Sequence, residues 1–457
     1  MSNRVSRIPG ARIGVRYLFT SLGFWICFNL GTLLWHRQFQ VFYFREPYLL
    51  AWTHLAALGW LTTGLMGIMY ATLPATLGVR PRSLRTARIQ YWLQLVGIAG
   101  LVLSMSLVPQ ARGRVVFGLL TLGALVIFVH NIATTVGRGK AWHLPEAHFI
   151  MAVFYLGITG LIGMSYVFYL NWAAVPQTMT HLKVHAHFAG IGWLALTSMG
   201  LTYKLLPLEL GVGNVPQRWG LAASVLMNLV FWGVFFGYAY DRPALLAGSA
   251  ILGVAGLVCH TMQVRTIARA HPSASPWFHD PLSLWERVRV RGTPWRRETT
   301  RTPAPSQGER ESDHSGTWDE SYLSGLAYTQ ASCLFGIAAA VLGLLLTTGA
   351  AGDSFAVEYA YGYAAGAGWF GLYVTGQTVW LVPLLLRDEA QEGMPEPRWI
   401  SLALPGQAAG TGLVSIGLLT GISPIVALGA AVNLAASLVV TACGVRLCWA
   451  QPAMAEK

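Results

Sequence analysis

Apolar runs long enough to cross a lipid bilayer follow one another along most of this 457-residue chain. An α-helix needs about 20 predominantly apolar residues to span the hydrocarbon core. Twelve runs of this kind occur, at 16–36, 47–74, 87–108, 114–136, 146–170, 178–206, 218–240, 243–267, 321–348, 355–386, 398–420 and 423–447. Only 11% of the residues are charged, against about 25% in soluble proteins. The sequence therefore predicts an all-α integral membrane protein with twelve transmembrane helices.

The basic residues between these runs predict the orientation of the helices. They concentrate in alternate connections, at 4–16, 80–88, 138–140, 204–218, 265–269, 387–398 and around Arg446. Because Lys and Arg are in excess on the cytoplasmic side of membrane proteins, we expect both termini in the cytoplasm of a bacterial inner membrane. The same distribution accounts for the net charge of +12. The expected partner is thus the lipid bilayer, and nucleic acid is not expected.

Residues 268–318 interrupt the series of apolar runs. This stretch is rich in Pro, Ser, Arg and Glu, a composition typical of disordered segments. Its centre, PLSLWERVRVRG, resembles translated copies of bacterial intergenic palindromic repeats. We therefore expect a disordered, basic cytoplasmic linker that arose by insertion; contact with anionic lipid headgroups is the alternative. The linker separates residues 1–267, with the first eight helices, from residues 319–457, with the last four.

The second, sixth and tenth predicted helices share a pattern of Gly, Trp and Pro. Superposing Gly59-Trp60, Gly192-Trp193 and Gly368-Trp369 also superposes Gly67, Gly200 and Gly376, and Pro74, Pro207 and Pro383. The same alignment places His54 on His187. Because the matching helices are four apart in the chain, the sequence predicts three pseudo-repeated four-helix units.

Histidine is costly inside a bilayer and marks a functional site by default. His54 and His187 are expected at matched depth on neighbouring helices, where two imidazoles can ligate one haem from its two faces. His185 lies about 200° around the helix from His187. It therefore faces a different side of the helix, where a second metal centre can bind. His181, one turn from His185, is a candidate ligand there. His181 and Lys183 are also candidates to pair with a haem propionate, and snorkelling to the headgroups is the structural alternative.

The stretch VHAHFAGIGWLALTSMGLTYKLLP within 178–206 resembles the tenth helix of the catalytic subunit (subunit I) of heme-copper oxidases. It is most similar to the haem-b cytochrome c oxidases of the C family and the related nitric oxide reductases, which share the pattern H-x-H, G-W and G-x-x-Y-x-L-x-P. The resemblance implies one or two b-type haems, with His185 on a high-spin haem, and His187 with His54 on a low-spin haem.

The same resemblance implies an activity and partners. If the chain is an enzyme, we expect a haem-dependent oxidoreductase of the terminal oxidase or nitric oxide reductase type. A c-type cytochrome or a quinol would be the electron donor, and accessory membrane subunits would be further partners. Haem near the outer face would serve electron transfer or the chemistry of O2 or NO.

The chain departs from that family in two places. The H-x-H pair stands on the sixth predicted helix, whereas the tenth has Tyr361 and Tyr363 at the corresponding positions. The copper or non-haem-iron site of the family needs an adjacent histidine pair on the seventh helix, and 218–240 contains no histidine. These departures argue against a copper or non-haem-iron centre. A twelve-helix transporter and a haem- or copper-handling protein without redox turnover therefore remain alternatives.

The other metal-binding residue types form no recognisable motif. The five cysteines include no CxxC and no CxxCH, so zinc sites and covalent c-type haem are not expected. His130 and His260 lie near predicted cytoplasmic helix ends, where a histidine complements the helix dipole. For His143 and His148 we expect capping and interfacial roles.

Overall fold

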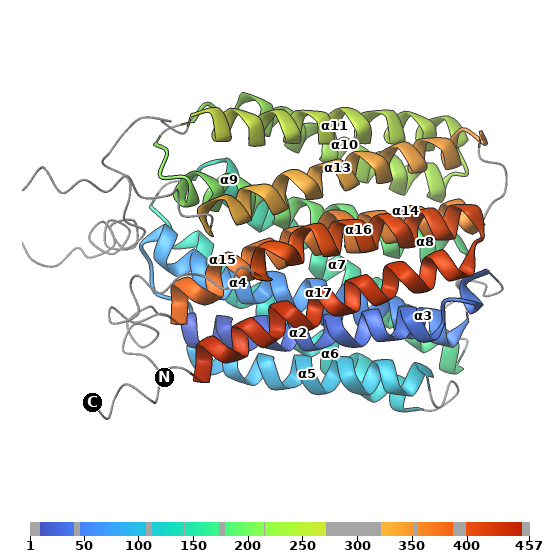
Figure 1. Cartoon of the computed structure of the whole chain (residues 1–457), viewed down its shortest axis with the longest axis horizontal. Helices are drawn as coiled ribbons and strands as arrows, with labels where there is room; N and C mark the ends of the chain where they lie inside the picture. Colours follow the sequence, from blue (N-terminus) through green and yellow to red (C-terminus); the bar gives the residue numbers. More distant parts are fainter. Residues whose placement is uncertain are drawn as a thin grey trace, which may run out of the picture.

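The computed structural model describes residues 10–40, 46–106, 112–140, 142–172, 179–213, 215–270, 321–350, 355–386 and 399–449. All regular elements in these ranges are helices, and the long ones run side by side between two ends of the molecule (Figure 1). Ten helices in the described part of the chain are long and apolar enough to cross a membrane. This confirms the all-α, multi-pass membrane class, while the number twelve stays a prediction. The predicted linker lies outside the described residues from position 271 onward.

The helices that surround the centre of the bundle are continuous α-helices. They are α2 (Ala11–Leu34), α5 (Leu84–Ser106), α6 (Gly113–Gly137), α7 (Leu144–Trp172), α10 (Arg218–Ala239), α11 (Pro243–Arg269), α13 (Ser321–Thr347), α16 (Trp399–Thr420) and α17 (Ser423–Trp449). A short 3-10 turn, η1 (Gln38–Gln40), follows α2. Sequence neighbours pack together, as α5 does on α6 and α10 on α11. The last described helix, α17, packs on the first, α2.

Three composite helices occupy the centre, and each changes from α to π and back. They are α3 (Pro47–His54), η2 (Leu55–Thr62) and α4 (Thr63–Leu77); α8 (Met179–His187), η3 (Phe188–Ala195) and α9 (Leu196–Glu209); and α14 (Phe355–Tyr363), η6 (Ala364–Gly371) and α15 (Leu372–Leu386). The three π segments contact one another. The most apolar windows of Pro47–Leu77 and Phe355–Leu386 are 78% and 89% buried, against 28–44% for the surrounding candidate spans. A side chain on a central helix therefore meets protein on most sides.

Each π segment contains the Gly-Trp pair as its fifth and sixth residues. A Cβ on the glycine would come within 3 Å of an aromatic ring on the preceding helix: Phe24 for Gly59, Tyr155 for Gly192 and Phe335 for Gly368. The indole Nε1 of Trp193 donates to Thr62 Oγ1 over 2.9 Å and so links η3 to η2. π segments inside α-helices are rare and frequently lie at functional sites. The Gly-Trp motif therefore marks the same local structure in all three central helices.

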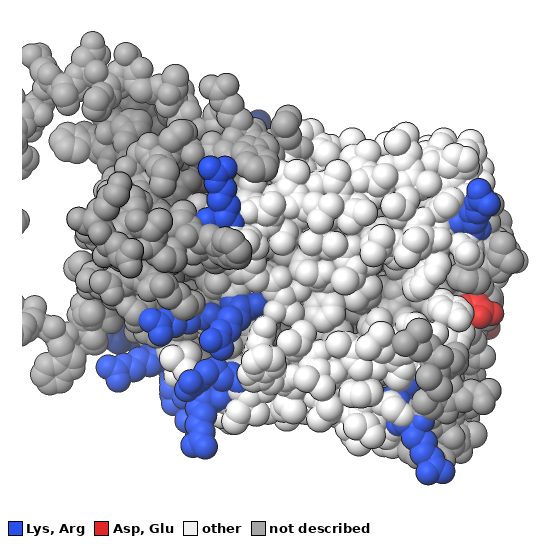
Figure 2. Space-filling view, turned by 60° about the horizontal axis from the view of Figure 1, so that its bottom comes forward, with Lys and Arg blue, Asp and Glu red and all other residues white. Residues whose placement is uncertain are grey.

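The two ends of the bundle differ in charge. We call the end at which α4, α9 and α15 finish the basic end, and the end at which α3, α8 and α14 begin the histidine end (Figure 1). In Figure 2, Lys and Arg side chains gather mainly at the basic end, and a broad band without charged side chains separates the two ends. That band is the surface expected to face lipid acyl chains.

Candidate functional site

The predicted ligands lie where the central helices change from α to π. His54 is the last residue of α3, and His187 is the last residue of α8. Tyr363 holds the corresponding place at the end of α14. The structure thus brings the candidate side chains to one level of the bundle, toward the histidine end, and their ring contacts divide them into three pairs.

The first pair consists of two imidazoles, from His54 and His185. Their ring centroids are 6.3 Å apart, with an angle of 23° between the planes. His54 Nδ1 lies 2.7 Å from the Leu50 carbonyl oxygen. Because a carbonyl only accepts, this nitrogen carries the proton and Nε2 keeps a free lone pair. His185 Nδ1 is buried without a hydrogen-bond partner, and a Cβ on Gly163 of α7 would lie 2.9 Å from the His185 ring.

The second pair is His187 with Tyr361. The ring centroids are 6.2 Å apart at an interplanar angle of 24°. His187 Nδ1 donates to the Lys183 carbonyl over 2.7 Å, and Nε2 is directed at the Tyr361 hydroxyl, 3.4 Å away. A Cβ on Gly343 of α13 would lie 3.3 Å from the Tyr361 ring. A glycine on the neighbouring helix therefore makes room for the second ring, as Gly163 does in the first pair.

The third pair, Tyr363 with Trp52, is part of a packed aromatic cluster. The ring centroids are 6.2 Å apart at 15°, and Phe28 stacks on both rings at 4.8 and 5.9 Å. The Trp52 indole donates to Thr32 Oγ1 over 3.0 Å. Tyr363 is buried, and its hydroxyl lies 3.2 Å from the Asn433 amide. An indole N–H is a donor only, so this pair offers no second ligand for a metal.

The structure groups the histidines differently from the pairing that the sequence favours. The alignment matches His54 with His187, but their ring contacts are with His185 and with Tyr361. The reason is geometric: in a ring of similar units, a given position meets a different position on the next unit, so matched residues do not meet each other. The alignment contained the needed signal, because Trp52 and Tyr361 both align with His185.

The two remaining candidates, His181 and Lys183, lie nearer the start of α8. His181 is exposed near the start of this helix. Lys183 Nζ lies 3.3 Å from Glu358 Oε1 on α14 and 5.9 Å from the centroid of the Tyr238 ring on α10. Lys183 therefore already has an anionic partner within the chain, one helical turn from the second pair.

The spacing and the donor atoms of the first pair are those that two imidazoles holding one iron would have. Metal–nitrogen bonds of about 2 Å on opposite sides of a metal place two imidazole centroids roughly 6 Å apart, and His54 and His185 show 6.3 Å. The bond from His54 Nδ1 to a backbone carbonyl is the usual support of a metal-ligating histidine. The Tyr363–Trp52 rings have almost the same spacing. The ring distance therefore does not distinguish the pairs, and the comparison depends on which atoms can ligate a metal.

The rings of the first two pairs are more accessible than Tyr363 of the third pair, which is buried. His54, His185, His187 and Tyr361 are all partly accessible, although they lie on central helices. Cβ atoms added to three nearby glycines of the central helices would have no heavy atom within 4 Å, namely Gly190, Gly362 and Gly366. Open space therefore remains at this level of the central helices, and Phe28 packs on both rings of the third pair.

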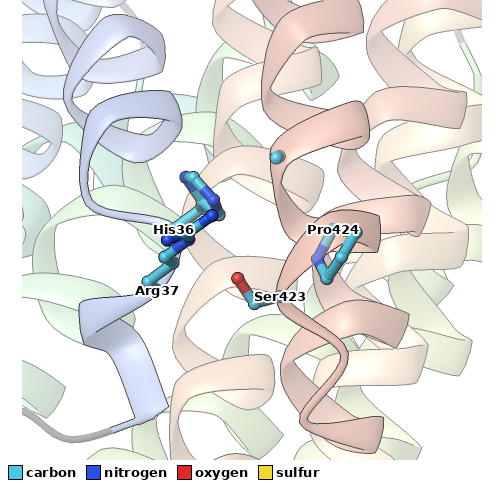
Figure 3. Close-up of a pocket in the computed structure, with 5 residues that line it drawn as sticks. His36, Arg37, Ser423 and Pro424 are labelled. Atoms are coloured by element: carbon cyan, nitrogen blue, oxygen red, sulfur yellow. The ribbon is translucent and has the colours of Figure 1, made fainter.

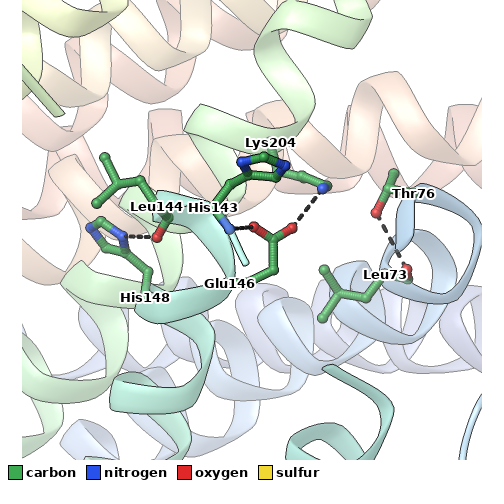
Figure 4. Close-up of polar contacts among 7 residues, drawn as sticks. All are labelled: Leu73, Thr76, His143, Leu144, Glu146, His148 and Lys204. Atoms are coloured by element: carbon green, nitrogen blue, oxygen red, sulfur yellow. Dashed lines mark hydrogen bonds and ion pairs between the residues drawn. The ribbon is translucent and has the colours of Figure 1, made fainter. Parts of the chain in front are cut away.

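A second polar cluster lies at the basic end, away from these pairs. Lys204 Nζ and Glu146 Oε1 are 2.6 Å apart, and Glu146 Oε2 accepts from the His143 backbone N–H (Figure 4). The Glu146 side chain is 1% exposed. Burial of both charges is tolerable because they are paired and hydrogen-bonded. This ion pair joins α7 to α9, so its role is to hold the two helices together.

The buried histidines near this cluster have partners of their own. His148 Nδ1 donates to the Leu144 carbonyl, and Nε2 lies 2.8 Å from Ser224 Oγ. His260 Nδ1 lies 2.9 Å from the Tyr203 hydroxyl. Both ring nitrogens of His148 are thus engaged at ordinary hydrogen-bond distance, whereas only Nδ1 of His54 has such a bond. His130 is exposed on α6.

A surface hollow of about 600 Å³ opens where α2 ends and α17 begins (Figure 3). It is lined by His36, Arg37, Ser423, Pro424 and Ala427. None of the ring pairs contributes to this lining, so the hollow is separate from the candidate site.

No protein-family model matches the chain, and no curated protein matches it. The assignment of a function therefore depends on the three ring pairs and on the resemblance of the H-x-H helix.

Proposed function

We propose that this chain is a haem-binding membrane protein of the oxidoreductase type, resembling the catalytic subunit of haem-b oxidases and nitric oxide reductases. The observation that carries the proposal is the pair of nearly parallel imidazoles of His54 and His185, with centroids 6.3 Å apart, on two central helices. These residues would hold one b-type haem by its two faces. When bound, the haem supplies electron transfer or chemistry on O2 or NO.

We also propose twelve membrane crossings in three four-helix units, with both termini in the cytoplasm. Ten described helices are long and apolar enough to cross a membrane by themselves. The described helices Met179–Glu209 and Trp399–Thr420 would supply the other two crossings. The repeat is supported by the matched π segments and by ring pairs at matched positions with centroids 6.2–6.3 Å apart.

The residues around the first pair prepare it for a ligand. The Leu50 carbonyl fixes the tautomer of His54, which keeps Nε2 available. Gly163 admits the His185 ring, which any larger residue would displace. The histidine end carries fewer basic residues than the opposite end (Figure 2), so we place it on the outer side. There a c-type cytochrome or a quinol would deliver electrons.

The spectrum of the purified protein tests this proposal. We expect Soret and α bands of b-type haem after reduction, and iron by elemental analysis. Carbon monoxide should leave the haem between His54 and His185 unshifted, because both axial positions are filled. A protein purified from haem-replete cells without these bands and without iron would refute the proposal.

Substitutions assign the ligands. His54→Ala and His185→Ala should each abolish the low-spin spectrum, whereas His130→Ala, an exposed histidine on α6, should retain it. His187→Ala distinguishes the two pairings. If it removes the low-spin haem and His185→Ala does not, the ligands are His54 and His187, as the sequence alone favours.

A further inference from the structure

The second ring pair lies on the other side of α8 from the first. His187 lies two residues after His185, which is about 200° around a helix. Accordingly, His185 packs against α3 and α7, through His54 and Gly163. His187 packs against α14 and α10, through Tyr361 and Tyr238, whose ring centroids lie 6.2 and 5.7 Å away. One helix thus presents two different sets of donors to two different neighbours.

The two donor atoms of the second pair are almost far enough apart to take a metal between them. His187 Nδ1 is held by the Lys183 carbonyl, so Nε2 has the free lone pair. The distance of 3.4 Å from Nε2 to the Tyr361 hydroxyl exceeds the roughly 2.7–3.2 Å of an ordinary hydrogen bond. Two ligand atoms on opposite sides of a metal would be about 4 Å apart. The pair therefore needs only a small separation of the helices to admit a metal.

The contacts around this pair hold it in place and leave space beside it. The Lys183–Glu358 ion pair joins α8 to α14 one turn away, and Gly343 makes room for the Tyr361 ring. Tyr361 and His187 are both partly accessible. By contrast, Tyr363, two residues further along α14, is buried in the aromatic cluster.

We propose that His187 and Tyr361 form a second iron site, which binds ferric haem through His187 Nε2 and the phenolate oxygen of Tyr361. This inference rests on the proposed function, because it assumes that the chain receives haem. Tyrosine ligates haem iron in catalase, and an anionic oxygen ligand favours the oxidised metal. On binding, the phenol O–H bond breaks, an iron–oxygen bond forms and the proton leaves to water, with no change in the oxidation state of the iron.

Optical and electron paramagnetic resonance spectra of the ferric protein test the second site. We expect a high-spin ferric signal with phenolate-to-iron charge-transfer absorption, in addition to the low-spin haem of the first pair. Tyr361→Phe should remove this signal and lower the haem content by one per chain, because it deletes only the hydroxyl. Tyr363→Phe is the matched control on the same helix and should keep both signals. His187→Ala should act like Tyr361→Phe.

The outcomes separate the second site from the proposed function. A wild-type protein that contains only low-spin haem, and whose spectrum is unchanged in Tyr361→Phe, refutes the second site but supports haem at the first pair. A high-spin signal that persists in Tyr361→Phe also refutes it. Complete absence of haem refutes both proposals.

Discussion

The His54–His185 pair and the Tyr363–Trp52 pair are built on the same frame but have different chemistry. One residue of each pair, His54 or Tyr363, directly precedes a π segment, and the ring centroids are 6.3 and 6.2 Å apart. In the first pair, His54 Nε2 keeps a free lone pair and His185 Nδ1 has no hydrogen-bond partner. In the third pair, Phe28 stacks on both rings. The frame therefore sets the ring spacing, and the side chains decide whether the position packs or binds.

The His187–Tyr361 pair is intermediate between these extremes. It has one imidazole nitrogen and one phenol oxygen, and it retains open space beside the glycines of the central helices. The three ring pairs have nearly equal spacing but offer two, two and one atoms that can ligate a metal. These are two nitrogens in the first pair, a nitrogen and an oxygen in the second, and one oxygen in the third, because an indole cannot ligate.

If the third pair only packs, its disruption should lower the stability of the fold and leave the haem content unchanged. Phe28→Ala removes a buried ring that stacks on both Trp52 and Tyr363. We expect a loss of about 3–5 kcal/mol in the free energy of unfolding, from the lost contacts and the cavity. Thermal unfolding in detergent measures this loss, with Leu30→Ala as control, since Leu30 is 43% exposed on the same helix. A selective loss of haem without loss of stability would make the third pair a binding site.

At the first pair, a change in the supporting glycine Gly163 should lower haem affinity, whereas disruption of the third pair lowers stability. In Gly163→Leu, the new side chain occupies the place of the His185 ring, because even a Cβ would lie 2.9 Å from it. We expect haem affinity at this site to fall about 10–100-fold, as for other losses of ligand support. Gly157→Leu on the same helix is the control, because a Cβ there meets no atom within 4 Å. Equal haem loss in both variants would show a general effect on α7.

The second pair can be converted into a copy of the first. Tyr361→His places a second imidazole opposite His187, at a position that the alignment matches with His185. We expect the haem content to stay unchanged while the high-spin ferric signal becomes a low-spin one, because an imidazole replaces the phenolate. Optical and paramagnetic resonance spectra measure the change. Retention of the high-spin signal would show that residue 361 is not a ligand.

The sequence predicts the class of the fold and the level of the site for clear physical reasons. Bilayer thickness fixes the length of the apolar runs, and the cost of an intramembrane imidazole singles out His54, His185 and His187. The pairing needs the structure, because the alignment shows that Trp52 and Tyr361 match His185 but not how the central helices are rotated toward one another. The alignment matched His54 with His187, whereas the ring contact joins His54 to His185.

Two further features lie outside what the residue pattern reveals. The π segments leave no signature beyond Gly-Trp, a dipeptide that also suits ordinary close packing of membrane helices. Gly163 and Gly343, which admit the His185 and Tyr361 rings, are two of 50 glycines in the chain. Only the neighbouring helix shows which glycine faces a ring, so their role requires tertiary structure.

The smallest expected effect concerns Lys183, which the sequence suggested as a cofactor-binding residue. Its ion pair with Glu358 is partly exposed, with side-chain accessibilities of 38% and 27%, and pairs of this kind contribute about 0–1 kcal/mol. Lys183→Met should therefore change the unfolding free energy by no more than that, and haem affinity by less than about fivefold, as measured by haem transfer to an apo-acceptor. Lys183→Arg controls for the loss of charge. A loss of haem affinity far above this limit in Lys183→Met, restored in Lys183→Arg, would instead show that the ammonium group pairs with a haem propionate, and Glu358 would then compete with the cofactor for the same cation.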